Sequence, residues 1–347
     1  MNFRSDNVMG ASPEVLEAIV AAARGDAHSY GADSYTGKLE ARLAEIFEHE
    51  LVVLPVATGT AANALCLAAL TPPWGAIYGH AEAHALTDEC GAPEMFSAGA
   101  KLVGLPGEHG RIQPHVLDEA LAAAGKGTVH HVQPAALTIT QATEAGTVYR
   151  IDGISALSVV AGMHEIKVHM DGARFANALV TLDCSPARMT WKAGIDMLSF
   201  GATKNGCLAA EAVISFDPSR RQELLFRRKR AGHLFSKARL LSAQLLAYLE
   251  GDLWLRNARH ANAMAARLGS GLAALPGARL AHPVEANEVF VDLPEPAIAA
   301  VEAAGFGVYR WHGPGTTRLR LVTSFATDPA DIDAFIATAS RACAAAA

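Results

Sequence analysis

The chain has 347 residues, of which 51% are hydrophobic and 18% charged, so it is long enough to bury the core of one large or two modest domains. Its formal net charge of -6 supplies no basic field for nucleic acid or an anionic membrane. No apolar run reaches membrane-spanning length, the polar N-terminus lacks a signal-peptide core, and the five cysteines are scattered. We therefore expect a cytoplasmic protein without nucleic-acid or membrane partners, a disulfide framework or a bound metal.

The first two thirds of the chain alternate between helix and strand patterns. Ser12-Pro13 begins a helix that stops at Gly25, a polar and aromatic loop covers 28–37, and an amphipathic helix covers 39–47. Apolar segments then predict strands at 51–56, 76–78, 101–105, 128–132, 166–170, 197–200 and 212–216. Helices lie between several of them, notably at 115–124 and 151–162. This alternation favours a mostly parallel sheet covered by helices on both faces.

The pattern changes after Phe216. A long basic stretch at 220–249 and a second segment at 254–275 predict helices. Short strands follow at 288–293, 307–311 and 317–323, with a helix at 297–304 between the first two and a closing helix from about Asp328. This content predicts a small α+β domain.

A turn of small residues follows the predicted strand at 51–56. In this turn Thr58, Gly59 and Thr60 stand at the start of an alanine-rich helix. Backbone N–H groups at a helix N-terminus, together with two hydroxyls, make a site for an anion such as phosphate. The turn is neither a Walker loop nor a dinucleotide fingerprint. A helix-capping threonine without any ligand explains the same residues.

Two charged residues stand at the ends of later strands. Asp171 lies at the carboxyl edge of its strand, where open α/β sheets bind ligands; it would serve there as a helix cap, a metal ligand or the partner of a protonated ring nitrogen. Lys204 follows the strand at 197–200 among small residues. Burial there lowers the pKa of a lysine and frees its amine to form a Schiff base, whereas a lysine that reaches solvent is the ordinary alternative.

A phosphate cradle, a carboxylate and a Schiff-base lysine, in this order along a parallel sheet, are what pyridoxal 5′-phosphate requires. The cradle anchors the phosphate, and Asp171 keeps the ring nitrogen protonated. Lys204 holds the aldehyde as an imine. One shared explanation for three separate signals favours a pyridoxal-phosphate enzyme.

The chain also resembles the low-specificity L-threonine aldolases over nearly its whole length. The motifs that carry this resemblance are Arg4-Ser5-Asp6-Asn7, Tyr30-Gly31 with Asp33 and Leu39-Glu40, Thr58-Gly59-Thr60 with Asn63, Ala83-His84 with Glu89, His169-Met170-Asp171-Gly172-Ala173-Arg174, Thr203-Lys204 and Leu319-Arg320-Leu321-Val322-Thr323. It implies the aspartate-aminotransferase-like α/β fold of fold type I, with a large, mostly parallel sheet sandwiched by helices and a small α+β domain. We assign 16–245 to the large domain, and 1–15 with 246–347 to the small one.

The resemblance also implies an activity. Members of this family cleave L-threonine, L-allo-threonine or related L-β-hydroxy-α-amino acids, including L-phenylserine, between Cα and Cβ to glycine and an aldehyde. A β-eliminating lyase or an aminotransferase on the same scaffold is an alternative. A third hypothesis is a cofactor-free protein that binds a sugar phosphate or a nucleotide. The superfamily further implies a homodimer or homotetramer with active sites at subunit interfaces.

Further roles follow only from this resemblance. His84 would lie over the cofactor ring, and Thr203 beside Lys204 would help to bind it. Residues that would hold the substrate carboxylate are Ser5, Arg174 and Arg320, and Arg174 would also contribute to cofactor binding. Tyr30 and Asp33 would lie in a loop that crosses from the partner subunit, and Lys229 and Arg230 would lie near the partner's cofactor phosphate.

Plainer explanations exist for several of these residues. His84 would otherwise be a surface-loop histidine, and Arg320 would face either solvent or a site because it alternates with apolar neighbours. Arg174 would otherwise form an ion pair with Asp171, one helical turn away. The basic run at 227–230 would be a solvated helix face.

One stretch departs from the family pattern. Many members carry an asparagine-threonine-histidine motif whose histidine approaches the substrate hydroxyl, but 133–146 of this chain contain no histidine. His130 and His131 precede that stretch and are expected to be structural. The contact to the β-hydroxyl is therefore unassigned, and His84 is the candidate base, directly or through water.

Overall fold

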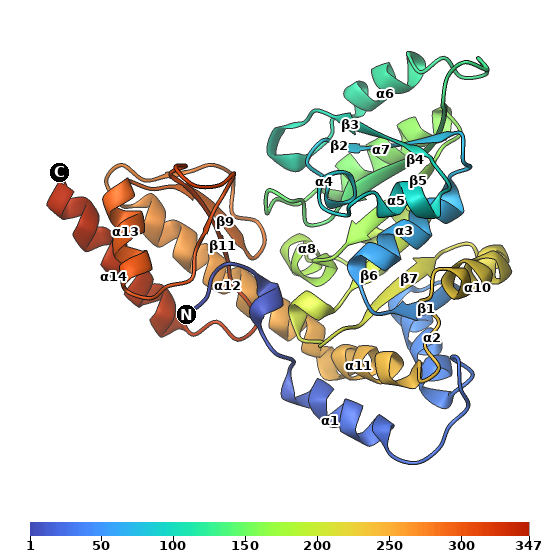
Figure 1. Cartoon of the computed structure of the whole chain (residues 1–347), viewed down its shortest axis with the longest axis horizontal. Helices are drawn as coiled ribbons and strands as arrows, with labels where there is room; N and C mark the ends of the chain where they lie inside the picture. The colour runs from blue at the N-terminus through green and yellow to red at the C-terminus, as the bar shows by residue number, and fades with distance from the viewer. Residues whose placement is uncertain (347) are drawn as a thin grey trace.

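Seven strands form the larger of two sheets in the computed structural model, which describes residues 1–346 (Figure 1). The strands, in their spatial order, are β1 (Val52–Val56), β7 (Glu211–Ser215), β6 (Met197–Gly201), β5 (Lys167–Gly172), β4 (Gln133–Thr140), β2 (Gly75–His80) and β3 (Lys101–Leu105). Strand β7 runs antiparallel to both of its neighbours, and all the other pairs are parallel. The carboxyl ends of β1, β6, β5, β4 and β2 therefore meet at one edge of the sheet.

Helices cover both faces of this sheet. In β7, Ala212 and Ile214 face one apolar core, whereas Val213 faces the other. The helices that contribute to the first core are α1 (Pro13–Ala23), α2 (Ser34–Phe47), α6 (Pro114–Ala122), α7 (Ile151–Met163), α8 (Phe175–Leu182), α9 (Pro186–Met189) and α11 (Arg239–Leu249). The helices on the second side are α3 (Gly59–Leu70), α4 (His84–Thr87), α5 (Ala92–Phe96) and α10 (Arg221–Arg230).

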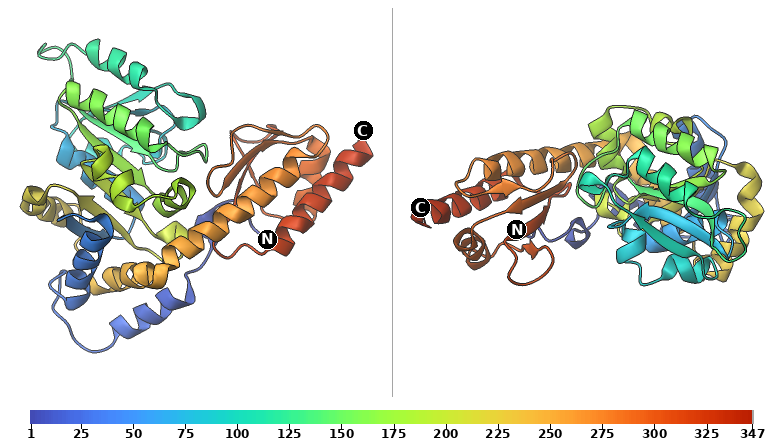
Figure 2. Two further views of the ribbon diagram at one scale, coloured as in Figure 1. Left: turned by 180° about the vertical axis from the view of Figure 1, so that it is seen from behind. Right: turned by 90° about the horizontal axis from the view of Figure 1, so that it is seen from above.

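The smaller sheet is antiparallel and has its own core. Its strands, in order, are β10 (Tyr309–Arg310), β11 (Arg318–Val322), β9 (Glu288–Asp292) and β8 (Arg279–Leu280). The helices around it are α12 (Leu253–Ala273), α13 (Glu295–Ala303) and α14 (Pro329–Ala346). Helix α12 extends from one part of the molecule into the other (Figure 2): Trp254 and Ala258 belong to the large core, and Leu268 and Leu272 to the small one.

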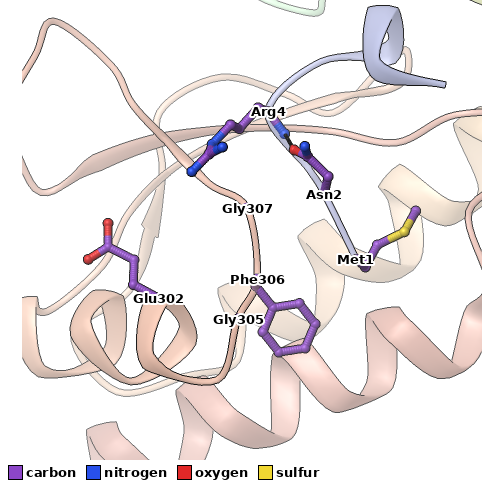
Figure 3. Close-up of a pocket in the computed structure, with 7 residues that line it drawn as sticks. All are labelled: Met1, Asn2, Arg4, Glu302, Gly305, Phe306 and Gly307. Atoms are coloured by element: carbon purple, nitrogen blue, oxygen red, sulfur yellow. Dashed lines mark hydrogen bonds between the residues drawn. The ribbon is translucent and has the colours of Figure 1, made fainter.

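The N-terminal segment joins the small sheet before the chain enters the large domain. The N–H of Phe3 donates to the carbonyl of Gly307 at 2.7 Å, and the N–H of Val322 donates to the carbonyl of Phe3 at 2.8 Å. A surface hollow of about 520 Å³ lies beside this segment, lined by Met1, Asn2, Arg4, Glu302 and 305–307 (Figure 3). The hollow lies on the small domain, away from the carboxyl edge of the large sheet.

The predicted fold class is confirmed, but two predicted elements are wrong. The segment 128–132 forms a turn in which Val129 is 92% exposed, and the strand begins only at Gln133. Pro134 is tolerated there because the pairing of β4 with β2 shifts register beside it. The predicted helix at 220–249 is broken into α10 and α11, with Gly232 at a φ of 77° in the turn between them.

The division of the chain at residues 16 and 246 stays a prediction. Among the described residues, no helix is long and apolar enough to cross a membrane. Within residues 1–346, no three or more His, Cys, Asp or Glu side chains come together in a way that could hold a metal ion.

Candidate active site

Four chain segments bring polar residues to the carboxyl edge of the large sheet. Thr58 caps α3 directly after β1, and Lys204 lies in a 3₁₀ turn, η4 (Thr203–Asn205), directly after β6. Asp171 is the penultimate residue of β5, and His84 follows β2. Because these strands are parallel, the predicted phosphate cradle, lysine, aspartate and histidine reach the same edge.

Asp171 is fixed by hydrogen bonds to both carboxylate oxygens. Oδ1 accepts from the N–H of Ala173 at 3.0 Å, and Oδ2 accepts from Nδ2 of Asn63 at 2.8 Å. The same Asn63 nitrogen donates to Oε1 of Glu89 at 2.7 Å, and Nδ1 of His84 lies 2.9 Å from that oxygen. A continuous chain of hydrogen bonds therefore joins Asp171 to His84.

Glu89 determines the state of His84 in this chain of hydrogen bonds. Its carboxylate is buried and accepts from Nδ1 of His84, which raises the pKa of the histidine above its usual value. The other oxygen of Glu89 and Oδ1 of Asn63 are buried without a hydrogen-bond partner among residues 1–346. Unmet polar atoms beside Asp171 are typical of a site that a ligand or water completes.

We expect Glu89→Gln to lower the pKa of His84. The variant replaces the negatively charged acceptor that favours the imidazolium with a neutral amide, so the neutral ring should persist to lower pH. NMR titration of ¹³C-labelled histidine, with the His84 signal assigned through His84→Gln, measures the change. The exposed Glu82→Gln is the matched control, and an unmoved His84 titration in Glu89→Gln would contradict the assignment.

The turn that carries Lys204 is anchored by a buried glutamate. Glu211 begins β7, and because β7 is antiparallel its amino end lies at the same edge of the sheet. Oε2 of Glu211 accepts from the N–H of Ala202 at 3.1 Å. Burial raises the pKa of Glu211 to about 7, although hydrogen bonds from the turn and the charge of Lys204 act in the opposite direction.

Glu211 gives the free energy of unfolding a defined pH dependence. Between its unfolded value of 4.5 and its folded value of about 7 the native state binds more protons, so stability falls as pH rises through this interval. We expect Glu211→Gln to remove up to about 3 kcal/mol of that fall. Urea unfolding from pH 4.5 to 7.5 measures it, with the exposed Glu250→Gln as control; an unchanged pH slope in Glu211→Gln would contradict the expectation.

The cradle at Thr58 has the features of an anion site. The Thr58 hydroxyl accepts from the N–H of Ala61 at 3.1 Å and so caps the helix. The first N–H groups of a helix, here those of Gly59 and Thr60, have no acceptor inside the helix. Nothing lies within 4 Å of the position that a side chain on Gly59 would take, so the space in front of these groups is open.

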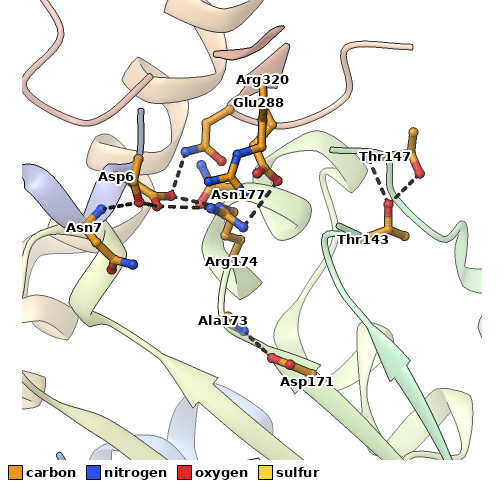
Figure 4. Close-up of polar contacts among 12 residues, drawn as sticks. Asp6, Asn7, Thr143, Thr147, Asp171, Ala173, Arg174, Asn177, Glu288 and Arg320 are labelled. Atoms are coloured by element: carbon orange, nitrogen blue, oxygen red, sulfur yellow. Dashed lines mark hydrogen bonds and ion pairs between the residues drawn. The ribbon is translucent and has the colours of Figure 1, made fainter. Parts of the chain in front are cut away.

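Arg174 lies between two carboxylates from other parts of the chain (Figure 4). Its Nε is 2.8 Å from Oδ2 of Asp6, and its Nη1 is 3.3 Å from Oε2 of Glu288. All three side chains are buried. The expected alternative, an ion pair of Arg174 with Asp171, is wrong: the partners of Arg174 come from the N-terminal segment and from β9.

This charge cluster shifts the pKa values of its members in different directions. Burial raises the pKa of Asp6, but Arg174 and Lys204 outweigh it, so the value lies below normal. Burial also raises the pKa of Glu288, in this case to about 7, because Arg174 and Arg320 compensate it only in part. Arg174 therefore has one firmly ionised partner and one that titrates near neutrality.

Arg320 and Ser5 flank the cluster. Arg320 lies on β11 with its guanidinium over the rings of Tyr309 and Trp311, at 5.4 and 5.2 Å from their centroids. Its Nη2 donates to the carbonyl of Arg4 at 3.2 Å, while its Nε is buried without a partner in residues 1–346. The Ser5 hydroxyl accepts from the N–H of Asn7 at 3.1 Å. Figure 4 shows Arg320 beside Glu288 and Arg174.

Four other predicted residues lie elsewhere in the subunit. Asp33 is buried and caps α2, accepting from the N–H of Thr36 at 2.9 Å. Tyr30 is 52% exposed, and Nζ of Lys229 lies 5.3 Å from its ring centroid. Lys229 and Arg230 line a second hollow of about 810 Å³ between α3, α5 and α10. Within residues 1–346, these contacts do not join the four residues to the strand edge.

Four carboxylates and one arginine carry more of the electrostatics than the sequence indicated. Asp6 and Glu89 stood inside family motifs without a role, whereas Glu211 and Glu288 begin strands, where an isolated glutamate gives no signal of burial. Arg228 is the buried member of the basic run, and burial lowers its pKa to about 10. Its Nε has no hydrogen-bond partner among residues 1–346.

Comparison with known proteins identifies the family and the fold of the chain. Residues 2–296 match the family described as β-eliminating lyase. The chain is 43% identical over 316 residues to the low specificity L-threonine aldolase of Pseudomonas aeruginosa, covering 91% of both chains. A threonine aldolase structure from Leishmania major is 29% identical with a TM-score of 0.91, covering 98% of both chains. A structure of SPT with PLP internal aldimine, at 17% identity and a TM-score of 0.69, shares the fold; it covers 99% of this chain and 87% of the other.

The fold and the strand-edge cluster define this chain as an α/β protein of the fold type I class. The family and the structures that it matches are those of pyridoxal-phosphate enzymes. Within that class it belongs to the β-eliminating lyase family and is a homologue of the low-specificity L-threonine aldolases.

Proposed function

We propose that this protein is a pyridoxal-phosphate-dependent aldolase that cleaves L-threonine, L-allo-threonine or related L-β-hydroxy-α-amino acids to glycine and an aldehyde. The observation that carries the proposal is the position of Asp171 and Lys204 at the carboxyl ends of the adjacent strands β5 and β6. The 43% identity to a low specificity L-threonine aldolase supports the same assignment.

The residues present suit this cofactor. The open first turn of α3, with Thr58, Gly59 and Thr60, would hold the phosphate. Asp171 would hold a protonated ring nitrogen, and Lys204, with Thr203 beside it, would hold the aldehyde carbon. When bound, pyridoxal phosphate supplies an electron sink next to the substrate amino group.

His84 is suited to lie against the cofactor ring with a fixed orientation. Its Nδ1 is engaged by Glu89, so Nε2 is the ring nitrogen that remains for a proton or a water. The chain of hydrogen bonds through Asn63 ties this imidazole to Asp171. The hydrogen bonds therefore fix the imidazole of His84 and the carboxylate of Asp171 relative to each other before the substrate binds.

Ser5, Arg174 and Arg320 are proposed to fix the substrate carboxylate. Arg320 has a buried Nε with no partner in the described chain, so it offers a free donor. Arg174 forms ion pairs with Asp6 and Glu288, which hold its positive charge in a fixed position. Holding the carboxylate in place in this way would orient the substrate so that its Cα–Cβ bond takes the position required for cleavage.

A product assay tests the proposal. The purified protein, supplied with pyridoxal phosphate, is incubated with L-threonine, L-allo-threonine and both L-β-phenylserine diastereomers, and the products are identified. Glycine with acetaldehyde or benzaldehyde supports the aldolase. Formation of 2-oxobutanoate and ammonia from L-threonine, without glycine, would instead show a β-eliminating lyase, and transfer of the amino group to a 2-oxo acid an aminotransferase.

We further propose a homodimer or homotetramer in which Tyr30, Asp33, Lys229 and Arg230 serve the active site of the neighbouring subunit. In the isolated subunit these residues lie on α10 and the loop before α2, apart from the strand edge. Sedimentation that finds an active monomer would contradict this arrangement.

A further inference from the structure

One acidic residue at the strand edge has no role in the reaction outlined above. The loop after β4 (141–147) leaves the sheet between β5, which carries Asp171, and β2, which leads to His84. It is the stretch in which the sequence contains no histidine for the substrate hydroxyl. Glu144 is the one ionisable side chain within this loop.

The loop is held rigidly around Glu144. The N–H of Gln141 donates to the carbonyl of Asp171 at 2.8 Å, and the Gln141 side chain bonds both backbone groups of Tyr149, at 2.9 and 3.0 Å. The hydroxyls of Thr143 and Thr147 lie 2.9 Å apart, and both donate to the carbonyl of His109. Figure 4 shows the two threonine side chains side by side.

The loop also packs directly on the charge cluster around Arg174. Gly146 has a φ of 71°, and a side chain there would come within 3.0 Å of Cβ of Glu288. This close approach brings the loop backbone against Glu288, the partner of Arg174. Glycine is required at this position by both the conformation and the contact.

Glu144 is the exception to the burial of this loop. Every residue from 141 to 149 is buried except Glu144, which is partly exposed. The polar groups of the neighbouring residues hydrogen-bond to one another. No hydrogen bond or ion pair within residues 1–346 involves the carboxylate of Glu144. A rigid, buried loop thus presents a single unengaged carboxylate.

The charge of Glu144 acts on groups from three different elements. It adds to the rise in the pKa of His84, whose largest cause is Glu89, and to the rise in the pKa of Arg174, which burial opposes and Asp6 and Glu288 favour. It also adds to the effect of burial in raising the pKa of Glu288. The carboxylate therefore lies within electrostatic reach of the histidine, of the proposed carboxylate-binding arginine and of β9.

We propose that the carboxylate of Glu144 receives the β-hydroxyl of the substrate, an inference that rests on the proposed aldolase function. The loop that carries this group is hydrogen-bonded to Asp171 at the strand edge and packs against Glu288, the partner of Arg174. Glu144 accepts the hydroxyl proton, and the electron pair of the O–H bond forms the carbonyl of the aldehyde. The Cα–Cβ bond breaks and its electron pair stays with the glycine fragment. A proton from water is then added at Cα while Glu144 returns its proton to water, so atoms and charge balance.

Comparison of two reactions of the same protein tests this role. Glycine has no hydroxyl, and exchange of its Cα proton with D₂O uses the same carboxylate-binding and cofactor-binding residues. We expect Glu144→Gln to lower kcat/KM for L-threonine by about 10²-fold or more, which is the usual contribution of general acid–base catalysis. The rate of glycine exchange, followed by NMR, should stay within about threefold of wild type, because no β-hydroxyl takes part.

Further variants separate this role from a structural one. Glu144→Asp should recover part of the lost kcat/KM and change the ratio of L-threonine to L-allo-threonine cleavage, because the carboxylate is kept but retracted. The exposed Glu108→Gln, beside the same loop, should match wild type. Glycine exchange that falls in parallel with threonine cleavage, or a Glu144→Gln kcat/KM within threefold of wild type, would overturn the proposal. Wild-type protein that releases no glycine from any β-hydroxy substrate would instead refute the aldolase function itself.

Discussion

Replacing Lys204 by alanine is expected to lower kcat for L-threonine cleavage by roughly 10³-fold or more, since the nucleophilic amine is lost while the rest of the site remains. The turn around Lys204 is anchored by Glu211 and by Asn205, which donates to the hydroxyl of Tyr248 at 2.7 Å. Neither anchor uses the lysine side chain. The variant should therefore fold normally and fail in the chemistry alone.

A visible absorption band provides the second readout for this variant. Wild-type protein mixed with pyridoxal phosphate should gain the band of a protein-bound imine, and Lys204→Ala should not. The exposed Lys38→Ala is the control for loss of one positive charge. A Lys204→Ala protein that keeps wild-type turnover would contradict the assignment, and a wild-type protein that gains no band would favour a cofactor-free binding protein.

Arg174→Met is expected to lower the free energy of unfolding by about 3–5 kcal/mol, as is usual when one partner of a buried ion pair is removed. The substitution keeps most of the side-chain volume but removes the cation that pairs with the buried carboxylates of Asp6 and Glu288. It should also weaken substrate binding, because the fixed positive charge near the proposed carboxylate site disappears.

Chemical unfolding at matched protein concentration measures the loss of stability. Arg267→Met is the matched control, since Arg267 makes a comparable two-point contact with Asp333 at the surface. Loss of that exposed pair should cost about 1 kcal/mol or less. Equal losses in the two variants would show that the Arg174 cluster contributes no more than a surface pair.

Local sequence patterns were enough to place the residues at the strand edge. Each of Thr58, Asp171 and Lys204 directly follows or ends an apolar strand, and parallel strands bring their carboxyl ends together. The error at 128–132 has a local cause: Pro134 argues against a strand, and only the register shift in the pairing with β2 accommodates it. The turn at Gly232 was visible in the sequence but was outweighed by the helical pattern around it.

Contacts between distant segments were outside the reach of such patterns. The partners of Arg174 are 168 residues away at Asp6 and on a strand of the other sheet at Glu288. The burial of Glu211 depends on the antiparallel direction of β7, which no residue of β7 specifies. Glu144 has no sequence signal of its own, and its position follows from the order of β5, β4 and β2.

The path of helix α12 bears on how the protein loses its structure. One end of this helix is packed in the large core through Trp254, and the other in the small core through Leu268 and Leu272. Helix formation is cooperative along the chain, so melting either core withdraws support from residues that the other needs. We therefore expect the two sheets to unfold together in one cooperative transition. A fragment cut at the boundary between them would expose the apolar surface that α12 buries in the other core.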